Sequence, residues 1–300
     1  MMALAFPVLP ALTELTPRAG ASSSEHRARS VRVAVCQIRC VNSDVAGNVQ
    51  RVEKAVEGAV AKGAQIAAFP EAVFIGWVNT EAHELAEPIP GKFSDIVCEL
   101  AMKHEIMISI GLTEGVETGI YNSMILVNSA GKILLKHRKI NTLVELLTPP
   151  YLRGRKEDLT AVDTPLGRIG VLICADSFLE EHHKIMASKK PQLLLIPYGW
   201  AADKKKWPGH GKKLEETVSR IAKNVGAATV GPNLLGEITT GPWKGKTLQG
   251  HSVVADSTSK IIALGKDNEE EILIVDVPLP PKTGDHLGRR NSRMPPDMPF

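Results

Sequence analysis

A regular alternation of β-branched runs and helical periods is the feature that most constrains how this chain can fold. Residues 31–38 read Val-Arg-Val-Ala-Val-Cys-Gln-Ile and predict a buried strand. Apolar positions then recur with a period near 3.6, which predicts a helix capped by Asn48 and ended by Gly63. Residues 65–69 predict the next strand. Strand, helix and strand in this order form a crossover unit, so we expect an α/β fold.

The remaining sequence extends this pattern and adds antiparallel strands. A helix over 94–104, capped by Ser94, precedes a strand over 106–112, and two alternating runs around Ser129-Ala-Gly predict a hairpin over 121–139. Further elements are expected as helices at 179–188 and 212–225 and as strands at 169–173, 192–196, 227–230, 252–255, 261–264 and 272–277. No linker interrupts these elements, so a single domain from 31 to 280 is predicted.

The distribution of charge separates this body from two tails. The 300-residue chain has 36 basic and 33 acidic side chains, a formal charge of +3. Residues 1–30 and 281–300 together hold seven of the basic and four of the acidic side chains, which leaves 29 of each between them. A neutral body argues against nucleic acid as a partner. Residues 1–30 are predicted to be an N-terminal extension, disordered or targeting, and residues 281–300 a C-terminal tail.

Apolar runs and cysteines indicate where such a chain would function. The longest apolar runs are far shorter than the ~20 residues that span a bilayer, so no membrane association is expected. Four cysteines at 36, 40, 98 and 174 form no C-x-x-C pair, which favours a reducing compartment. The cytoplasm is therefore predicted, or an organelle if the Ser- and Arg-rich residues 1–30 are a transit peptide.

Three reactive side chains follow predicted strands, where α/β sheets place their functional crevice. Glu71 follows Phe69-Pro, Lys139 ends the second strand of the hairpin, and Cys174 follows an apolar strand. A thiol with a pKa near ~8.5 needs a base, and Glu71 is the candidate. The Lys139 ammonium and the backbone N–H of Ala175 would stabilise an oxyanion. This set predicts acyl transfer through a thioester.

Each of these residues also has a structural interpretation. Cysteine is among the most buried residue types, so Cys174 alone would be read as an inert core thiol. Glu71 alone could be a solvated turn residue, and Lys139 part of a solvated basic strand edge. Their occurrence together, each after a strand, favours the catalytic interpretation.

With these residues in place, the chain resembles the carbon-nitrogen hydrolases of the nitrilase superfamily over roughly residues 31–280. The resemblance rests on five motifs: Ala34-Val-Cys-Gln37, Phe69-Pro-Glu71, Tyr121-Asn-Ser123, His137-Arg-Lys139 and Gly170-Val-Leu-Ile-Cys174-Ala-Asp176. It implies Glu71 as general base, Lys139 as oxyanion-stabilising cation and Cys174 as nucleophile. It also implies a four-layer αββα sandwich that assembles as a homo-oligomer, no metal or organic cofactor, and a supporting role for Glu145 in orienting substrate or lysine.

The residues after Cys174 bear on the bond that is cut. Nitrilases proper typically carry Cys-Trp-Glu, whereas amidase branches more often have an aspartate two places on, as in Cys174-Ala-Asp176. The favoured function is therefore hydrolysis of a small linear amide, with release of ammonia or an amine. The alternatives are a nitrilase that converts a nitrile to an acid and ammonia, and a non-catalytic member that binds a small molecule or a partner protein.

Weaker signals complete the set of candidates. Tyr198 and Trp200 follow a predicted strand and are candidate substrate-binding residues, with aromatic packing on the sheet as the alternative. His182 and His183 lack partners at metal-like spacing, so we expect a surface pair and no metal site. Glycine-rich phosphate-binding motifs are absent from the sequence.

Overall fold

The computed structural model describes residues 29–281. The two predicted tails, 1–30 and 281–300, therefore lie outside the described residues except for 29–30 and 281. Within the described range, no helix is both long enough and apolar enough to cross a bilayer.

The first sheet combines parallel and antiparallel strands. Its strands are, in spatial order, β15 (Glu271–Pro278), β1 (Ser30–Gln37), β2 (Ile66–Ala68), β3 (Met107–Val116), β4 (Gly119–Val127) and β5 (Ile133–Arg138). β1, β2 and β3 run parallel, as the predicted crossover units require, while β3, β4 and β5 form an antiparallel meander that contains the predicted hairpin. β5 is an edge strand, paired on one side only.

The second sheet follows the same plan. Its strands are β14 (Ile261–Leu264), β13 (Val253–Ala255), β10 (Ala228–Gly231), β8 (Leu193–Leu195), β7 (Gly167–Val171) and β6 (Ala161–Thr164). β7, β8 and β10 are parallel; β6 pairs antiparallel with β7, β13 with β10, and β14 with β13. The carboxyl ends of β7 and β8 thus lie beside each other.

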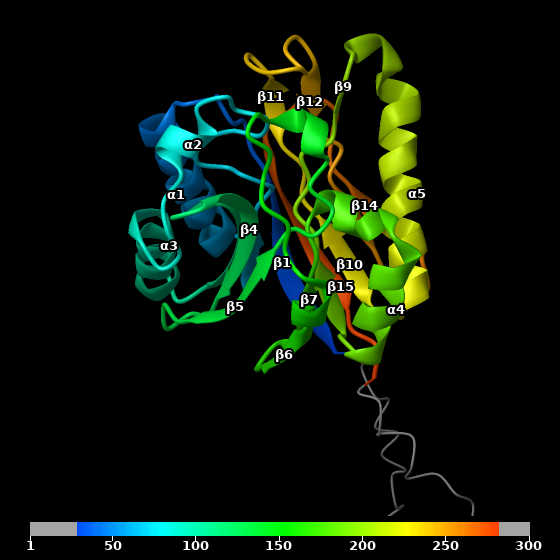
Figure 1. Ribbon diagram of the computed structural model, residues 1–300. Coiled ribbons are helices and arrows are strands. Elements are labelled where there is room, and N and C mark those ends of the chain that lie inside the picture. The colour runs from blue at the N-terminus through cyan, green and yellow to red at the C-terminus, as the bar shows by residue number, and fades with distance from the viewer. Residues whose placement is uncertain (1–28, 282–300) are drawn as a thin grey trace, which may run out of the picture.

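Helices cover the outer face of each sheet and give four layers (Figure 1). α1 (Val45–Ala61) and α3 (Lys92–Lys103) pack on the first sheet, and α4 (Glu180–Ser188) and α5 (Trp207–Val225) lie outside the second. The predicted αββα sandwich is confirmed. β15 pairs with β1 over eight residues. The last described strand therefore lies in the same sheet as the first, at its edge.

Alternation along β1 shows why the sheets stack. Val31, Val33 and Val35 point into the core between the two sheets, whereas Ala34 and Cys36 face the layer of α1. From Val33 to Cys36 the strand is buried on both faces and every position is apolar, whereas Arg32 near its start is exposed and pairs with Asp276.

Several elements differ from expectation. α1 begins at Val45 with Asp44 as its cap, because the Asp44 carboxylate accepts a hydrogen bond from the Gly47 N–H; Asn48 lies inside the helix. α3 begins two residues before Ser94, and α5 begins at Trp207 rather than at 212. A third sheet, of β11 (Leu235–Glu237), β12 (Thr247–Gln249) and β9 (Ala201–Ala202), was not predicted, since strands of two or three residues carry no periodic signal. The four-residue α2 (Ala82–Leu85) was missed for the same reason.

Candidate active site

Glu71 lies in a turn that follows β2 and is held against β3. The Gly111 N–H donates to the Pro70 carbonyl at 3.0 Å, and the Val73 N–H donates to the Gly111 carbonyl at 3.1 Å. A β-carbon at Gly111 would come within 2.7 Å of the Glu71 Cα, so this approach requires glycine. The Glu71 N–H also donates at 3.4 Å to the carbonyl of Tyr198, which lies three residues past β8 of the second sheet. The turn is thereby fixed between the two sheets.

Lys139 directly follows the edge strand β5. Its N–H donates to the Asn122 carbonyl of β4, and its carbonyl accepts from the Gly154 N–H, both at 2.8 Å. These bonds extend β5 past its last residue and send the lysine side chain between the sheets, where only 1% of the residue is exposed. Burial alone would lower the pKa of Lys139, but the charges beside it, chiefly Glu71, raise that pKa above its ordinary value. The ammonium therefore stays charged.

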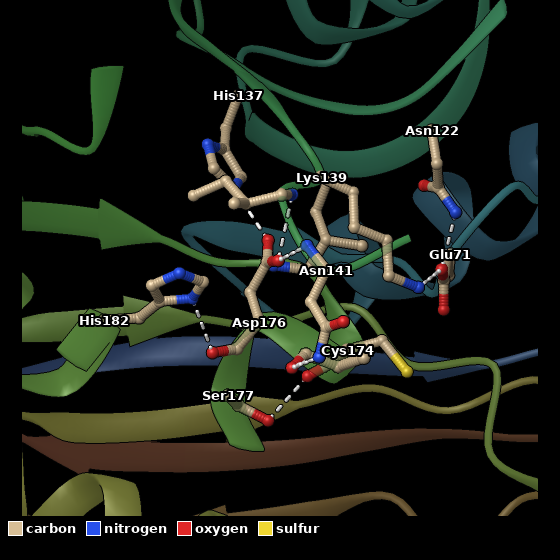
Figure 2. A network of polar contacts seen from close by, with 12 residues as sticks. Glu71, Asn122, His137, Lys139, Asn141, Cys174, Asp176, Ser177 and His182 are labelled. Atoms are coloured by element: carbon tan, nitrogen blue, oxygen red, sulfur yellow. Dashed lines mark hydrogen bonds and ion pairs between the residues drawn. The ribbon is translucent and has the colours of Figure 1, made fainter. Parts of the chain in front are cut away.

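The two oxygens of Glu71 have different surroundings (Figure 2). Oε1 accepts hydrogen bonds from Lys139 Nζ at 2.5 Å and from Asn122 Nδ2 at 2.6 Å. Oε2 is buried and has no hydrogen-bond partner within residues 29–281. One oxygen thus holds the carboxylate in place, and the other is free to accept a proton.

Cys174 opens a 3-10 helix, η3 (Cys174–Phe178), three residues after β7 ends. Its φ of 42° lies in the left-handed region, which is unfavourable for a residue with a side chain and is characteristic of sharp turns at functional sites. The residue is 3% exposed. Burial and the charge of Glu71 raise the pKa of the thiol to about 12, while the charge of Lys139 acts to lower it. The resting sulfur is therefore protonated at neutral pH.

Side chains satisfy four consecutive carbonyls of η3. The partners are Ser177 Oγ for the Cys174 carbonyl, Asn141 Nδ2 for that of Ala175, His182 Nδ1 for that of Asp176 and His183 Nε2 for that of Ser177, at 2.6, 3.1, 3.0 and 2.8 Å. Because each carbonyl is engaged, the strained turn is held in one conformation.

The prediction that His182 and His183 form a surface pair is therefore wrong. Both are buried, at 2% and 1% exposure, and both bind the backbone of η3. His183 Nδ1 also contacts Asn224 Nδ2, and burial lowers the pKa of His183. No cluster of three or more potential metal ligands occurs among residues 29–281.

The other sequence candidates lie in different places. Tyr198 is fully buried, and its hydroxyl contacts Ser177 Oγ at 2.9 Å, so its side chain supports η3. Trp200 is half-buried, stacks on His210 at 4.9 Å and donates from Nε1 to the His210 carbonyl. Ala175 is the second residue of η3, where the N–H groups of a short helix have no partner inside the helix.

Glu145 does not join the three reactive residues. It is exposed on a short 3-10 helix, η1 (Val144–Leu146), and no hydrogen bond or ion pair connects it to Glu71, Lys139 or Cys174 in the described structure. Its supporting role stays a prediction that rests on the resemblance alone.

Two further residues, to which the sequence motifs assign no role, lie near Glu71 and Lys139. Asn122 lies in the hairpin motif Tyr121-Asn-Ser123 and positions Glu71. The Tyr151 hydroxyl is buried without a partner among the described residues, and the charges of Glu71 and Lys139 both act on it. Burial raises the pKa of Tyr151 to about 12, so it can donate a hydrogen bond at neutral pH. The motif could have pointed to Asn122, whereas Tyr151 follows two prolines in a loop without a pattern.

This sandwich, with a thiol, an ammonium and a carboxylate between its sheets, defines a class of protein. A model of the carbon-nitrogen hydrolase family matches residues 32–281, and the chain belongs to that family. The resemblance to the carbon-nitrogen hydrolases seen in the sequence is confirmed, and the protein is an enzyme of that family.

The proteins to which the chain is similar include amidases. The omega-amidase NIT2-A of Xenopus laevis is 28% identical over 240 residues, 77% of this chain and 83% of the relative. A chloroplastic omega-amidase of Arabidopsis thaliana is 28% identical over 260 residues, 82% of this chain and 67% of the relative. An amidase from Nesterenkonia sp., solved as a cysteine-to-alanine mutant in complex with butyramide, has the same fold. It gives a TM-score of 0.72 at 21% identity over 84% of this chain and 92% of that chain.

Proposed function

We propose that this enzyme hydrolyses a small linear amide through a thioester on Cys174. The observation that carries the proposal is the free Oε2 of Glu71, held beside a protonated thiol by two hydrogen bonds to Oε1. The names of the relatives support an amide substrate rather than a nitrile. The near-complete burial of Glu71, Lys139 and Cys174 supports a substrate with few atoms.

In the first half-reaction, Glu71 Oε2 takes the thiol proton as Sγ bonds to the amide carbon. The carbonyl oxygen becomes an oxyanion, and the Lys139 ammonium and the Ala175 N–H stabilise it. When this intermediate collapses, the carbon–nitrogen bond breaks and protonated Glu71 gives its proton to the leaving nitrogen. Ammonia or an amine departs, and the acyl group stays on sulfur.

Water completes the cycle in the second half-reaction. Glu71 takes a proton from water as its oxygen attacks the thioester carbon, and the same two donors stabilise the second oxyanion. The carbon–sulfur bond then breaks, and the proton returns from Glu71 to the sulfur. The sum is amide plus water to acid plus amine, with the enzyme unchanged.

A substrate panel tests this function. Aliphatic amides of two to five carbons, some with a distal carboxylate, are incubated with the enzyme while ammonia release is followed, and the matching nitriles are run beside them. We expect ammonia from at least one amide, an acyl adduct on Cys174 by mass spectrometry, and no turnover by Cys174→Ser with its fold retained. Ammonia from nitriles but not from the matching amides would identify a nitrilase. No adduct from any amide or ester, together with a thiol that resists specific labelling at neutral pH, would identify a binding protein.

The assembly and location of the chain are also proposals. A homo-oligomer is proposed from the family resemblance, and light scattering on the purified full chain tests it. The cytoplasm, or an organelle reached through residues 1–30, is the proposed location, and the chloroplastic relative supports the second. Imaging a fluorescent fusion with and without residues 1–30 separates the two.

A further inference from the structure

Asp176 lies two residues after Cys174, and its buried carboxylate carries four hydrogen bonds. Oδ1 accepts from the N–H groups of Ile140 and Asn141 at 3.0 and 2.8 Å. Oδ2 accepts from His137 Nε2 at 2.9 Å and from the Ile173 N–H at 3.3 Å. The residue is 0% exposed, so water cannot replace any of these donors.

The four donors belong to two segments, one at the end of a strand of each sheet. These segments carry the reactive residues Lys139 and Cys174. His137, Ile140 and Asn141 flank Lys139, at the end of the first sheet's edge strand. Ile173 directly precedes Cys174, beyond the end of β7 in the second sheet. Figure 2 shows the carboxylate between these two segments. One side chain therefore joins the backbone that carries the ammonium to the backbone that carries the nucleophile.

This arrangement matters because Lys139 follows an edge strand. Strand pairing restrains β5 from one side only, through β4. The Asp176 carboxylate supplies a restraint across the gap between the sheets. An ammonium that is misplaced by about 1 Å stabilises an oxyanion poorly and can cost about 100-fold in rate.

We propose that Asp176 is a positioning residue that fixes Lys139 relative to Cys174. It need not touch the substrate, because both of its oxygens are already engaged by protein groups. The proposal deepens the proposed function, on which it rests, and it assigns to the Cys174-Ala-Asp176 motif a role that is independent of the bond being cut.

The chemistry of Asp176→Asn makes it the informative variant. Each oxygen of Asp176 accepts two hydrogen bonds, so an amide nitrogen at either place would face N–H groups. If the amide nitrogen takes the place of Oδ2, it can donate to Nε2 of a neutral His137. The variant thus keeps part of the hydrogen-bond network and nearly the same side-chain volume. The cross-sheet bonds are weakened without creating a cavity. Asp176→Ala removes the whole network and serves as the second variant.

A matched control is available on the surface. Asp163 pairs with Arg168 at 2.6 Å, and its side chain is 72% exposed. Asp163→Asn makes the same chemical change in the same sheet as β7, away from the reactive group. It should leave both turnover and thiol reactivity at wild-type values.

The first measurement separates kcat from KM on the best amide of the panel. For Asp176→Asn we expect kcat to fall about 100-fold with KM changed by less than about threefold. A purely structural role would lower the melting temperature but leave kcat per folded molecule unchanged at a temperature where the variant is folded. That second result would overturn the proposal.

The second measurement does not depend on amide turnover. Methyl methanethiosulfonate, a small thiol reagent without an amide, labels Cys174 at a rate that follows its thiolate fraction, and peptide mapping separates it from the other three cysteines. Because the charge of Lys139 acts to lower the pKa of Cys174, the labelling profile of Asp176→Asn should shift to higher pH. An unchanged profile would overturn the positioning role. If wild type hydrolyses no amide but the profile still shifts, the proposed function fails while the positioning of Lys139 stands.

Discussion

The regions around Glu71 and Asp176 place two fully buried carboxylates close to the same cysteine, yet they surround them differently. Glu71 receives both of its hydrogen bonds on Oε1 and has Oε2 free, whereas Asp176 receives two on each oxygen. A carboxylate can take a proton only where an oxygen is available to it. Both carboxylates are equally buried. The number and placement of their hydrogen-bond donors therefore distinguish a general base, which has a free oxygen, from a positioning residue, whose oxygens are all engaged.

The strongest test of this comparison is Glu71→Gln. Loss of the base should lower kcat by about 1000-fold, within the range of general base catalysis. Removal of the charge of Glu71 also removes one cause of the raised pKa of Cys174, so labelling by methyl methanethiosulfonate should become faster at neutral pH. Turnover and thiol reactivity would then move in opposite directions, as steady-state kinetics and labelling can show.

Glu117→Gln is the control for this variant, since Glu117 is exposed in the turn between β3 and β4. It should change neither quantity. If Glu71→Gln kept wild-type turnover, Glu71 would be neither the base nor a positioning residue, and the comparison between the two carboxylates would fail.

Among the described residues, Lys139 is the only charged group that hydrogen-bonds to Glu71. Lys139→Met therefore measures how much the buried Glu71 carboxylate depends on this ion pair. The variant leaves a buried carboxylate beside a methionine, so we expect the free energy of unfolding to fall by about 3–5 kcal/mol. In the double variant Glu71→Gln, Lys139→Met no buried charge is left alone, and much of this loss should return. Denaturant titrations of the four proteins give the coupling energy. A double variant whose losses simply add would mean that the 2.5 Å contact carries no coupling.

The sequence predicts the three reactive residues because each follows a strand with a clear local pattern. It could not predict which oxygen of Glu71 is free, since that depends on Asn122 and Lys139, which are distant in the chain. The sequence also failed to predict the burial of His182 and His183, for a related reason. Both lie on a helix with a polar first turn, and only the fold reveals that carbonyls of η3 lie against them.

Glu114, on the outer face of the first sheet, is another carboxylate that can be compared with Glu71 and Asp176. Its carboxylate accepts from Ser123, Lys136 and Arg138 at 2.6 to 2.9 Å and is surrounded by donors, as Asp176 is. Burial opposes ionisation of both carboxyl groups. Hydrogen bonds from Arg138 and Lys136 outweigh it and lower the pKa of Glu114, and the bond from His137 does the same for the pKa of Asp176.

These lowered pKa values predict acid sensitivity. A group whose folded pKa is depressed contributes stability above its unfolded pKa, near ~4, and loses it as pH falls through the folded pKa. Glu114→Gln should therefore be less stable than wild type at pH 7 and should lose less stability between about pH 5 and 3. Its kcat should stay within about threefold, because Glu114 faces away from Cys174. Parallel stability curves for Glu114→Gln and wild type in that range would contradict the assignment.

The smallest expected effect concerns Glu145, for which the family resemblance and the geometry disagree. The resemblance implies that Glu145 orients the substrate or Lys139, and its loss would then lower kcat by a large factor. In the structure Glu145 is exposed, and the hydrogen bonds of Lys139 Nζ and of Glu71 run to other residues. Since an exposed carboxylate without these contacts fixes nothing in the buried group, Glu145→Gln should keep kcat and KM within about twofold of wild type. A fall in kcat of about 100-fold with an unchanged melting temperature would instead mean that η1 moves inward when substrate binds. Glu145 would then be a third carboxylate that acts on the reactive residues, beside Glu71 and Asp176.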